Sequence, residues 1–316
     1  EGGGSLYHEE GDVKSGIAVN LNITPVPFKT GQTQKLDFFV NKKPGNIPVP
    51  FSELEIAHTK LMHVIGVRSD LNEFFHIHPN PTSTPGHLLV DYAFLKPGLY
   101  KLWSEIKAAG VDYSFGHPEI SVQGDGVKEN KQVSFARNVI VGDYQVSLKM
   151  DEPAVKAHEH DLSFDIHTLT GKEVDVEDYL GAKMHLTVIK DDWKQFIHTH
   201  PSGGAGHGHE AWLIFPEAKA NGGGHDETET TAVGGDEVIS FNVVFPEAGL
   251  YKAFAQFRPL GSNLPADEAL TAAFWIEVKE TAPGGISVWW GLLIASLIAI
   301  VILSLGVKRF LQVKQV

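Results

Sequence analysis

The chain contains the same histidine-rich pattern twice, and this limits the folds available to it. Residues 61–79, LMHVIGVRSDLNEFFHIHP, align without a gap on residues 183–201, KMHLTVIKDDWKQFIHTHP. Flanking segments match as well: KLDFFV with DLSFDI, and FLKPGLYKLWSEI with FPEAGLYKAFAQF. A repeat at this spacing indicates two structural units of the same kind. We therefore expect one small fold to occur twice.

Short alternating runs make up each copy. IAVNLNI, HVIGV and YKLWSEI alternate apolar and polar residues, and turn signals such as KTGQ, RSDLN and KPG separate them. The length of 316 residues and the 42% hydrophobic content are sufficient for two globular cores. We predict an all-β fold: two tandem immunoglobulin-like antiparallel β-sandwich domains, followed by one C-terminal transmembrane α-helix.

The predicted domain boundaries follow from these patterns. They are an N-terminal extension (1–15), a first sandwich (16–124), a linker (125–140), a second sandwich (141–280) with a glycine- and histidine-rich insertion (202–236), a linker (281–285), a membrane helix (286–307) and a tail (308–316). Within the insertion, AWLIF at 211–215 could pair as a strand.

The C-terminal run ISVWWGLLIASLIAIVILSLGV carries no charge and is long enough to cross a bilayer as a helix. Aromatic residues open it and basic residues without acids follow it: Trp289, Trp290, Lys308, Arg309 and Lys314. The positive-inside rule then places the tail in the cytoplasm. We predict a single-pass cell-membrane protein whose bulk is periplasmic or extracellular, with Glu1 as a processed N-terminus.

Composition excludes several classes of function. A net charge of −13 with 26 Lys and Arg argues against a nucleic-acid partner, because phosphate binding needs a concentrated basic face. The absence of cysteine excludes disulfides, thiolate metal sites and cysteine nucleophiles. The sequence also lacks a nucleophile elbow, a phosphate loop, an HExxH motif and a dinucleotide fingerprint. We therefore expect no enzyme activity and no organic cofactor.

The histidines become informative once the strands pair. If HVIGV and FFHIH form a hairpin across RSDLN, His63 lies opposite His78, and His76 lies diagonal to His63 on the same face. Opposed side chains lie about 5 Å apart, so three imidazoles converge. A slip of one residue would destroy this arrangement. The same register gathers His185, His198 and His200, and it turns Met62 and Met184 toward the core.

Three imidazoles with an open position form a suitable site for Cu(II) or Zn(II), and the Irving–Williams order favours copper. His117, in FGHPE, could add a fourth ligand in the first copy. The candidate metal ligands are therefore His63, His76, His78, His117, His185, His198 and His200. An alternative stays open, in which each His-x-His-Pro fixes a strand corner by donating ring N–H bonds to backbone carbonyls.

The strings YLGAKMHLTVI, FIHTHP, FPEAGLYKAFAQF and TAAFWIEV together resemble small secreted bacterial domains of the YtkA-like type, akin to the periplasmic copper-resistance CopC group. The resemblance covers most of 141–280 well and 16–124 less closely. It implies a non-enzymatic extracytoplasmic domain associated with copper or other heavy metals. Its motif carries over to His185, His198 and His200, and by repeat to His63, His76 and His78. The segment EALTAAF departs from the pattern, because a further histidine is expected before the final strand.

Two functional hypotheses follow from the sequence. The first is a membrane-anchored protein that binds a transition metal, with copper preferred, through the His-x-His-Pro clusters. The alternative is a structural accessory subunit of a larger respiratory, photosynthetic or transport complex, in which the sandwiches are docking modules. The membrane helix could then pack on an integral-membrane partner through Gly291, Ala295 and Ala299, which form a small-residue face.

Overall fold

The structure is a computed structural model that describes residues 16–201, 238–265 and 267–281. The predicted extension 1–15, the insertion 202–236 with its AWLIF strand, the membrane helix 286–307 and the tail 308–316 lie outside the described residues. The described part contains β-strands and one short 3₁₀ helix, arranged in four sheets, which confirms the all-β prediction. A search of this part finds no helix with the length and apolar character that a membrane span requires.

The first unit comprises the strands up to β12. Its strands are β1 (Gly16–Thr24), β2 (Phe28–Lys29), β3 (Thr33–Lys43), β4 (Ile47–Pro48), β5 (Leu54–Glu55), β6 (Met62–Arg68), β7 (Phe74–Ile77), β8 (Asn80–Pro81), β9 (His87–Ala93), β10 (Gly98–Ala108), β11 (Val111–Gly116) and β12 (Ile120–Gln123), with helix η1 at Phe51–Glu53. One sheet has the order β1-β3-β9-β8, with β4 on β3; the other has the order β2-β12-β10-β6-β7, with β5 and β11 on β10.

The second unit comprises β13 onward. Its strands are β13 (Asn138–Val141), β14 (Tyr144–Met150), β15 (Ala154–Val155), β16 (Glu159–Thr168), β17 (Val176–Glu177), β18 (Met184–Lys190), β19 (Phe196–Thr199), β20 (Ile239–Val244), β21 (Gly249–Pro259) and β22 (Leu270–Lys279). The sheets have the orders β13-β14-β16-β20 and β15-β22-β21-β18-β19, with β17 on β21. Strand β13 begins inside the segment predicted to be a linker.

The pairings are antiparallel with two exceptions among the described strands. Strand β2 runs parallel to β12, and β15 runs parallel to β22. In each unit a long strand of one sheet (β1 or β14) is followed by a two-residue strand at the edge of the other sheet. The chain thus changes sheets without reversing its direction, and this produces a short parallel pair at an otherwise antiparallel edge.

Each unit encloses its own apolar core between its two sheets. The first core contains Leu21, Phe38 and Leu88 from one sheet and Met62, Val64 and Leu102 from the other. The second contains Leu148, Phe164 and Phe241 opposite Met184, Leu186 and Phe257. The two methionines therefore pack in the cores, as the strand alternation predicts.

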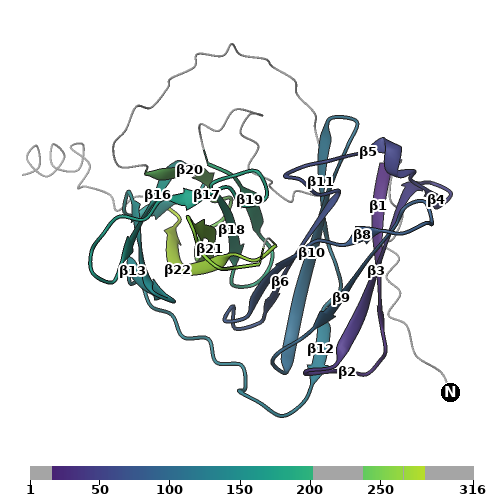
Figure 1. The fold of residues 1–316 in the computed structure, drawn as a ribbon, viewed down its shortest axis with the longest axis horizontal. Helices are drawn as coiled ribbons and strands as arrows, with labels where there is room; N and C mark the ends of the chain where they lie inside the picture. Colours follow the sequence, from purple (N-terminus) through teal and green to yellow (C-terminus); the bar gives the residue numbers. More distant parts are fainter. Residues whose placement is uncertain (1–15, 202–237, 266, 282–316) are drawn as a thin grey trace, which may run out of the picture.

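The central strands are buried on both faces. Every residue of β6 and of β18 is buried, although strand alternation turns only half of them toward the unit's own core. The other half belongs to a third apolar cluster formed by both units: Ile65, Val67, Leu71, Trp103, Ile189, Phe196, Phe254 and Trp275. Figure 1 shows the units side by side, with β6 and β10 on the side of the first that faces the second. The units are thus packed against each other through these sheets.

Candidate metal centre

The two hairpins adopt the register expected from the sequence. Val64 pairs with Ile77 and Ile65 with His76 in the first unit, and this register continues to His63 opposite His78. In the second unit Leu186 pairs with Thr199, which continues to His185 opposite His200. Because successive side chains alternate between faces, His63, His76 and His78 share the face that carries Ile65 and Val67 toward the other unit.

The histidines of the two hairpins meet at the contact between the units. The ring centroids of His63 and His198 lie 6.1 Å apart, and those of His76 and His198 lie 5.3 Å apart. His76 and His185 are 5.8 Å apart by the same measure. The sequence predicted two separate clusters, whereas the structure combines six of the predicted ligands in one. We call this set, together with His58, the histidine cluster.

His58 joins the cluster from outside the repeated motif. Its ring stacks on His200 with a centroid separation of 3.5 Å, and it makes an edge contact with His185 at 5.5 Å. The residue precedes β6 and has a positive φ of 46°, which a histidine adopts only occasionally. The aligned residue in the second copy is Leu180, so the repeat gave no indication of this histidine.

His117, the expected fourth ligand, lies elsewhere. Its Nε2 is 2.8 Å from the hydroxyl of Ser104, and its ring makes an edge contact with Phe38 in the core of the first unit. Ser104 and Glu105 are adjacent on β10, so their side chains point to opposite faces. Glu105 faces the histidine cluster, and His117 is therefore on the wrong side of β10 to reach it.

Two residues that the sequence reasoning missed hold the cluster from the opposite unit. His198 Nδ1 lies 2.6 Å from the Glu105 carboxylate, and His76 Nδ1 lies 2.8 Å from Gln256 Oε1. Glu105 and Gln256 are aligned in YKLWSEI and YKAFAQF, on the same strand face as Trp103 and Phe254. Counting alternate residues in these two strings could have identified them.

Two other hydrogen bonds fix the histidines to the backbone. His63 Nε2 lies 2.9 Å from the carbonyl of Ala57, and His185 Nε2 lies 2.9 Å from the carbonyl of Tyr179. A carbonyl oxygen only accepts, so Nε2 carries the proton in both rings. A neutral imidazole has one N–H, and the Nδ1 of His63 and of His185 therefore presents a lone pair to the cluster.

Four other ring nitrogens of the cluster lack suitable donors. With its Nδ1–H donated to Gln256, His76 has a bare Nε2, which lies 3.0 Å from the bare Nδ1 of His63. In the described part of the chain, the buried Nε2 atoms of His78 and His198 have no hydrogen-bond partner. Such orphaned atoms are costly inside a protein. A cation that accepts several of these lone pairs removes that cost.

Burial lowers the pKa of five histidines of the cluster, and the neighbouring imidazoles lower it further. The pKa values of His63, His76, His185 and His200 lie well below that of a free imidazole, and the pKa of His78 falls to about 3. These side chains are therefore neutral at physiological pH. A neutral imidazole is the form that binds a metal ion.

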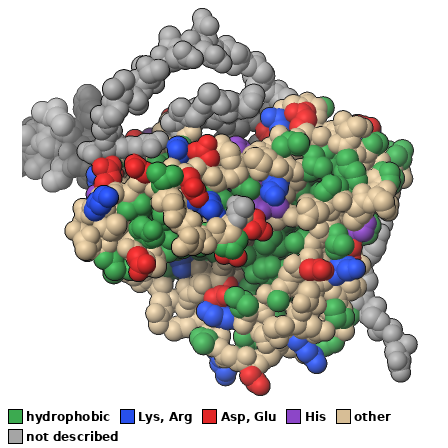
Figure 2. All heavy atoms as spheres, in the orientation of Figure 1, with side chains coloured by type: hydrophobic (Ala, Val, Ile, Leu, Met, Phe, Trp, Pro, Cys, Tyr) green, Lys and Arg blue, Asp and Glu red, His purple; other side chains and the backbone are tan. Residues whose placement is uncertain are grey.

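Three groups of histidines each place one nitrogen per residue within 4.8 Å of the others. They are His58–His185–His200, His63–His76–His78 and His76–His185–His198. The first-unit trio predicted from sequence thus comes together. Each group that contains His185 includes a histidine of the first unit. Histidine is visible only in small patches on the face drawn in Figure 2, in keeping with the burial of the cluster.

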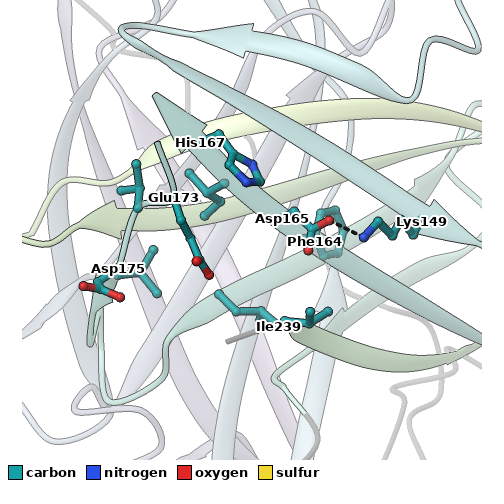
Figure 3. Close-up of a pocket in the computed structure, with 11 residues that line it drawn as sticks. Lys149, Phe164, Asp165, His167, Glu173, Asp175 and Ile239 are labelled. Carbon is teal, nitrogen blue, oxygen red and sulfur yellow. Dashed lines mark ion pairs between the residues drawn. The ribbon is translucent and has the colours of Figure 1, made fainter. Parts of the chain in front are cut away.

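A separate cavity of about 250 Å³ lies in the second unit (Figure 3). Its labelled polar residues are Lys149, Asp165, His167, Glu173 and Asp175, and Lys149 pairs with Asp165 at 2.5 Å. Its lining residues do not appear in any of the three possible metal-binding groups of the described residues. The cavity is therefore separate from the histidine cluster.

No curated protein matches the chain. Solved structures that resemble it include trypsin-activated alpha-2-macroglobulin from Escherichia coli, with a TM-score of 0.23 and 9% identity over 83% of this chain and 15% of that one. A mutant of Salmonella alpha-2-macroglobulin gives a TM-score of 0.21 and 12% identity over 80% and 14%. This chain thus spans only about 15% of the length of the structures it matches. A family model matches residues 12–120 and 138–280, so the chain belongs to the family described as Domain of unknown function (DUF8832).

Proposed function

We propose that this protein binds a first-row transition metal ion, copper or zinc, through the histidine cluster between its two units. The observation that carries the proposal is the set of lone pairs that converge there without donors. His63 has donated its only N–H to the carbonyl of Ala57 and His76 to Gln256, so their bare nitrogens face each other at 3.0 Å. His198 presents a buried Nε2 with no partner among the described residues. Such preformed lone pairs favour a cation.

Charge also favours a cation. Glu105 makes a partly buried contact with His198, and its second carboxylate oxygen, itself buried, has no hydrogen-bond partner in the described part of the chain. The Nε2 of His198 on the other side of this contact also has no partner among the described residues. A divalent ion bound to this Nε2 gives it a partner and balances the carboxylate. Buried charges need such compensation.

The types of ligand atom in the cluster limit which metal ions it can bind. Imidazole nitrogens suit zinc and copper, whereas calcium and magnesium prefer oxygen ligands. Cysteine is absent and both aligned methionines pack in the cores, so no soft sulfur ligand is supplied. The resemblance to YtkA-like and CopC-like domains favours copper. Together with the apolar run at 286–307, it supports an extracytoplasmic, membrane-anchored carrier or buffer rather than a catalyst.

A second candidate function rests on the same hydrogen bonds. His63 bonds to Ala57 and His185 to Tyr179 in the manner expected of a structural corner. If these bonds are the whole role of the histidines, the chain is an accessory subunit whose sheets dock on a larger membrane complex. The corner reading leaves His63 Nδ1, His76 Nε2 and His198 Nε2 without a hydrogen-bond donor among the described residues, and this makes metal binding the better proposal.

Metal content of protein purified from its native membrane without chelator tests the two candidates. Mass spectrometry of the sample should find at least about one copper or zinc ion per chain, and the same sample shows which proteins co-purify. Absence of both metals, together with failure to bind added Cu²⁺ or Zn²⁺, would reject the metal site. A fixed set of membrane partners at constant ratio would then support the accessory subunit.

A further inference from the structure

The hydrogen bonds of the histidine cluster cross between the units in both directions. His198, from the second unit, is held by Glu105 of the first at 2.6 Å, and His76, from the first, is held by Gln256 of the second at 2.8 Å. Glu105 on β10 lies directly opposite His63 on β6, and Gln256 on β21 lies directly opposite His185 on β18. Each unit therefore positions a histidine of the other.

One of the three groups uses these crossing contacts fully. His76, His185 and His198 are all buried, and each has its other ring nitrogen in a hydrogen bond. The partners are an amide oxygen, a backbone carbonyl and a carboxylate. Metal-binding histidines almost always have such a partner on the nitrogen that does not bind the metal, because it fixes the tautomer and orients the ring.

The ring positions of this group suit one ion. Its centroids are 5.3, 5.7 and 5.8 Å apart. Three imidazoles at about 2 Å from a tetrahedral ion have centroids about 5 Å apart, so small movements complete the site. In contrast, His58 and His200 are stacked at 3.5 Å, and stacked rings point their nitrogens in parallel rather than toward a common ion.

The competing group, His63–His76–His78, shares His76, but fewer hydrogen bonds orient its rings. His63 and His76 have partners on their outer nitrogens, whereas no hydrogen bond holds the ring of His78 among the described residues. With its Nδ1 bonded to Gln256, His76 has only one nitrogen to offer. Since this nitrogen can bind only one ion, His76 can be a ligand in one of the two groups but not in both.

We propose that the metal centre is one site shared between the units, with His76, His185 and His198 as ligands and Glu105 and Gln256 as positioning residues from opposite units. This inference rests on the proposed function and makes it specific. In the metal-free arrangement His185 Nδ1 lies 2.9 Å from His200 Nε2, and the ion replaces that contact.

The test is a titration of the full-length protein, after chelator treatment and dialysis, with Zn²⁺ for stoichiometry and Co²⁺ for its visible spectrum. The unaltered protein should bind about one tight ion per chain, and Co²⁺ should give the intense bands of a four-coordinate site. His76→Ala, His185→Ala and His198→Ala should each remove that ion. His87→Ala, on β9 outside the cluster, is the matched control and should keep it. His78→Ala and His200→Ala probe the two competing groups, and the shared site predicts that neither removes the ion.

The outcomes separate the possible failures. Loss of the ion in His78→Ala but not in His198→Ala would overturn the shared site in favour of the first-unit group. Two tight ions, one lost in His78→Ala and the other in His200→Ala, would also overturn it. No ion in the unaltered protein would overturn the proposed function itself.

A variant that keeps all ligands guards against misfolding. Glu105→Gln should retain about one ion per chain with the same Co²⁺ spectrum but bind it about 10–100-fold more weakly. The double variant Glu105→Gln/Gln256→Glu, which has a carboxylate at the aligned position instead, should partly recover the affinity that Glu105→Gln loses. Equal affinity in all three proteins would overturn the positioning role. Thermal unfolding of each metal-free variant confirms that it is folded.

Discussion

The indole ring of Trp103 lies flat against the ring of Phe196 from the other unit, with centroids 4.9 Å apart and planes 12° apart. The aligned pair in the reverse direction, Phe74 and Phe254, is stacked at 4.4 Å and 15°. Both stacks belong to the apolar cluster between the units. Phe196 and Phe74 lie on the strands of His198 and His76, and their partners Trp103 and Phe254 lie on the strands of Glu105 and Gln256. The aromatic contacts therefore set the distance at which the histidines of the two units meet.

We expect Trp103→Ala to lower the free energy of unfolding by about 3–5 kcal/mol, because it removes a fully buried ring and leaves a cavity between the units. Urea unfolding of the metal-free protein measures this. Ile140→Ala is the control, since Ile140 is 69% exposed, and it should change stability by less than about 0.5 kcal/mol. Equal effects of the two substitutions would contradict the packing of the units described here.

The metal-free protein should lose stability as the pH falls below about 6.5. Burial lowers the pKa of His63, His76 and His185, so the unfolded chain binds more protons than the folded one below the pKa of a free imidazole. The contribution of His78 to stability decreases as the pH falls, until the pH reaches the folded-state pKa of His78, about 3. Unfolding in urea at pH 7.5 and pH 5.5 tests this, and a higher stability at pH 5.5 would contradict it.

A buried lysine, Lys252, should affect the free energy of unfolding at alkaline pH. Lys252 donates to the carbonyl of Leu71 at 2.7 Å and to Asn72 at 3.0 Å across the contact between the units, and burial lowers its pKa to about 8. Between that value and about 10.4 the unfolded chain binds more protons, so this group raises stability as the pH rises.

The measurement is the change in unfolding free energy between pH 7.5 and 9.5. Lys252→Met should show a smaller increase, or a larger decrease, than the unaltered protein over this interval. The exposed Lys29 provides the control, and Lys29→Met should follow the unaltered protein. Identical pH profiles for Lys252→Met and the unaltered protein would show that Lys252 titrates normally.

Metal should stabilise the folded chain by mass action. At a free Zn²⁺ concentration about 100-fold above the dissociation constant, the free energy of unfolding should rise by about 2.7 kcal/mol. A chelator should reverse the increase, and His198→Ala should not show it. Differential scanning calorimetry with and without Zn²⁺ provides the comparison. An equal increase in His198→Ala would mean that the stabilising ion binds elsewhere.

Local patterns in the sequence were enough for the hairpins and for the face on which the histidines lie. The apolar alternation of HVIGV and the turn RSDLN place His63 opposite His78, and the observed register agrees. The burial of Met62 and Met184 in the cores follows from the same alternation. These features depend on neighbours along the chain and on one strand pairing, and a sequence pattern records both.

The contact between the units was decided only by the tertiary structure. Ile65, Trp103 and Phe254 make the outer faces of two sheets apolar, which signals a covered surface but does not say what covers it. His198 meets Glu105, and His76 meets Gln256, only because these two faces pack on each other. The alternation of a strand fixes the direction of a side chain, whereas its partner across an interface depends on how two separate sheets are oriented. The sequence therefore contained the ligands, and the packing of the units brought them together in one cluster.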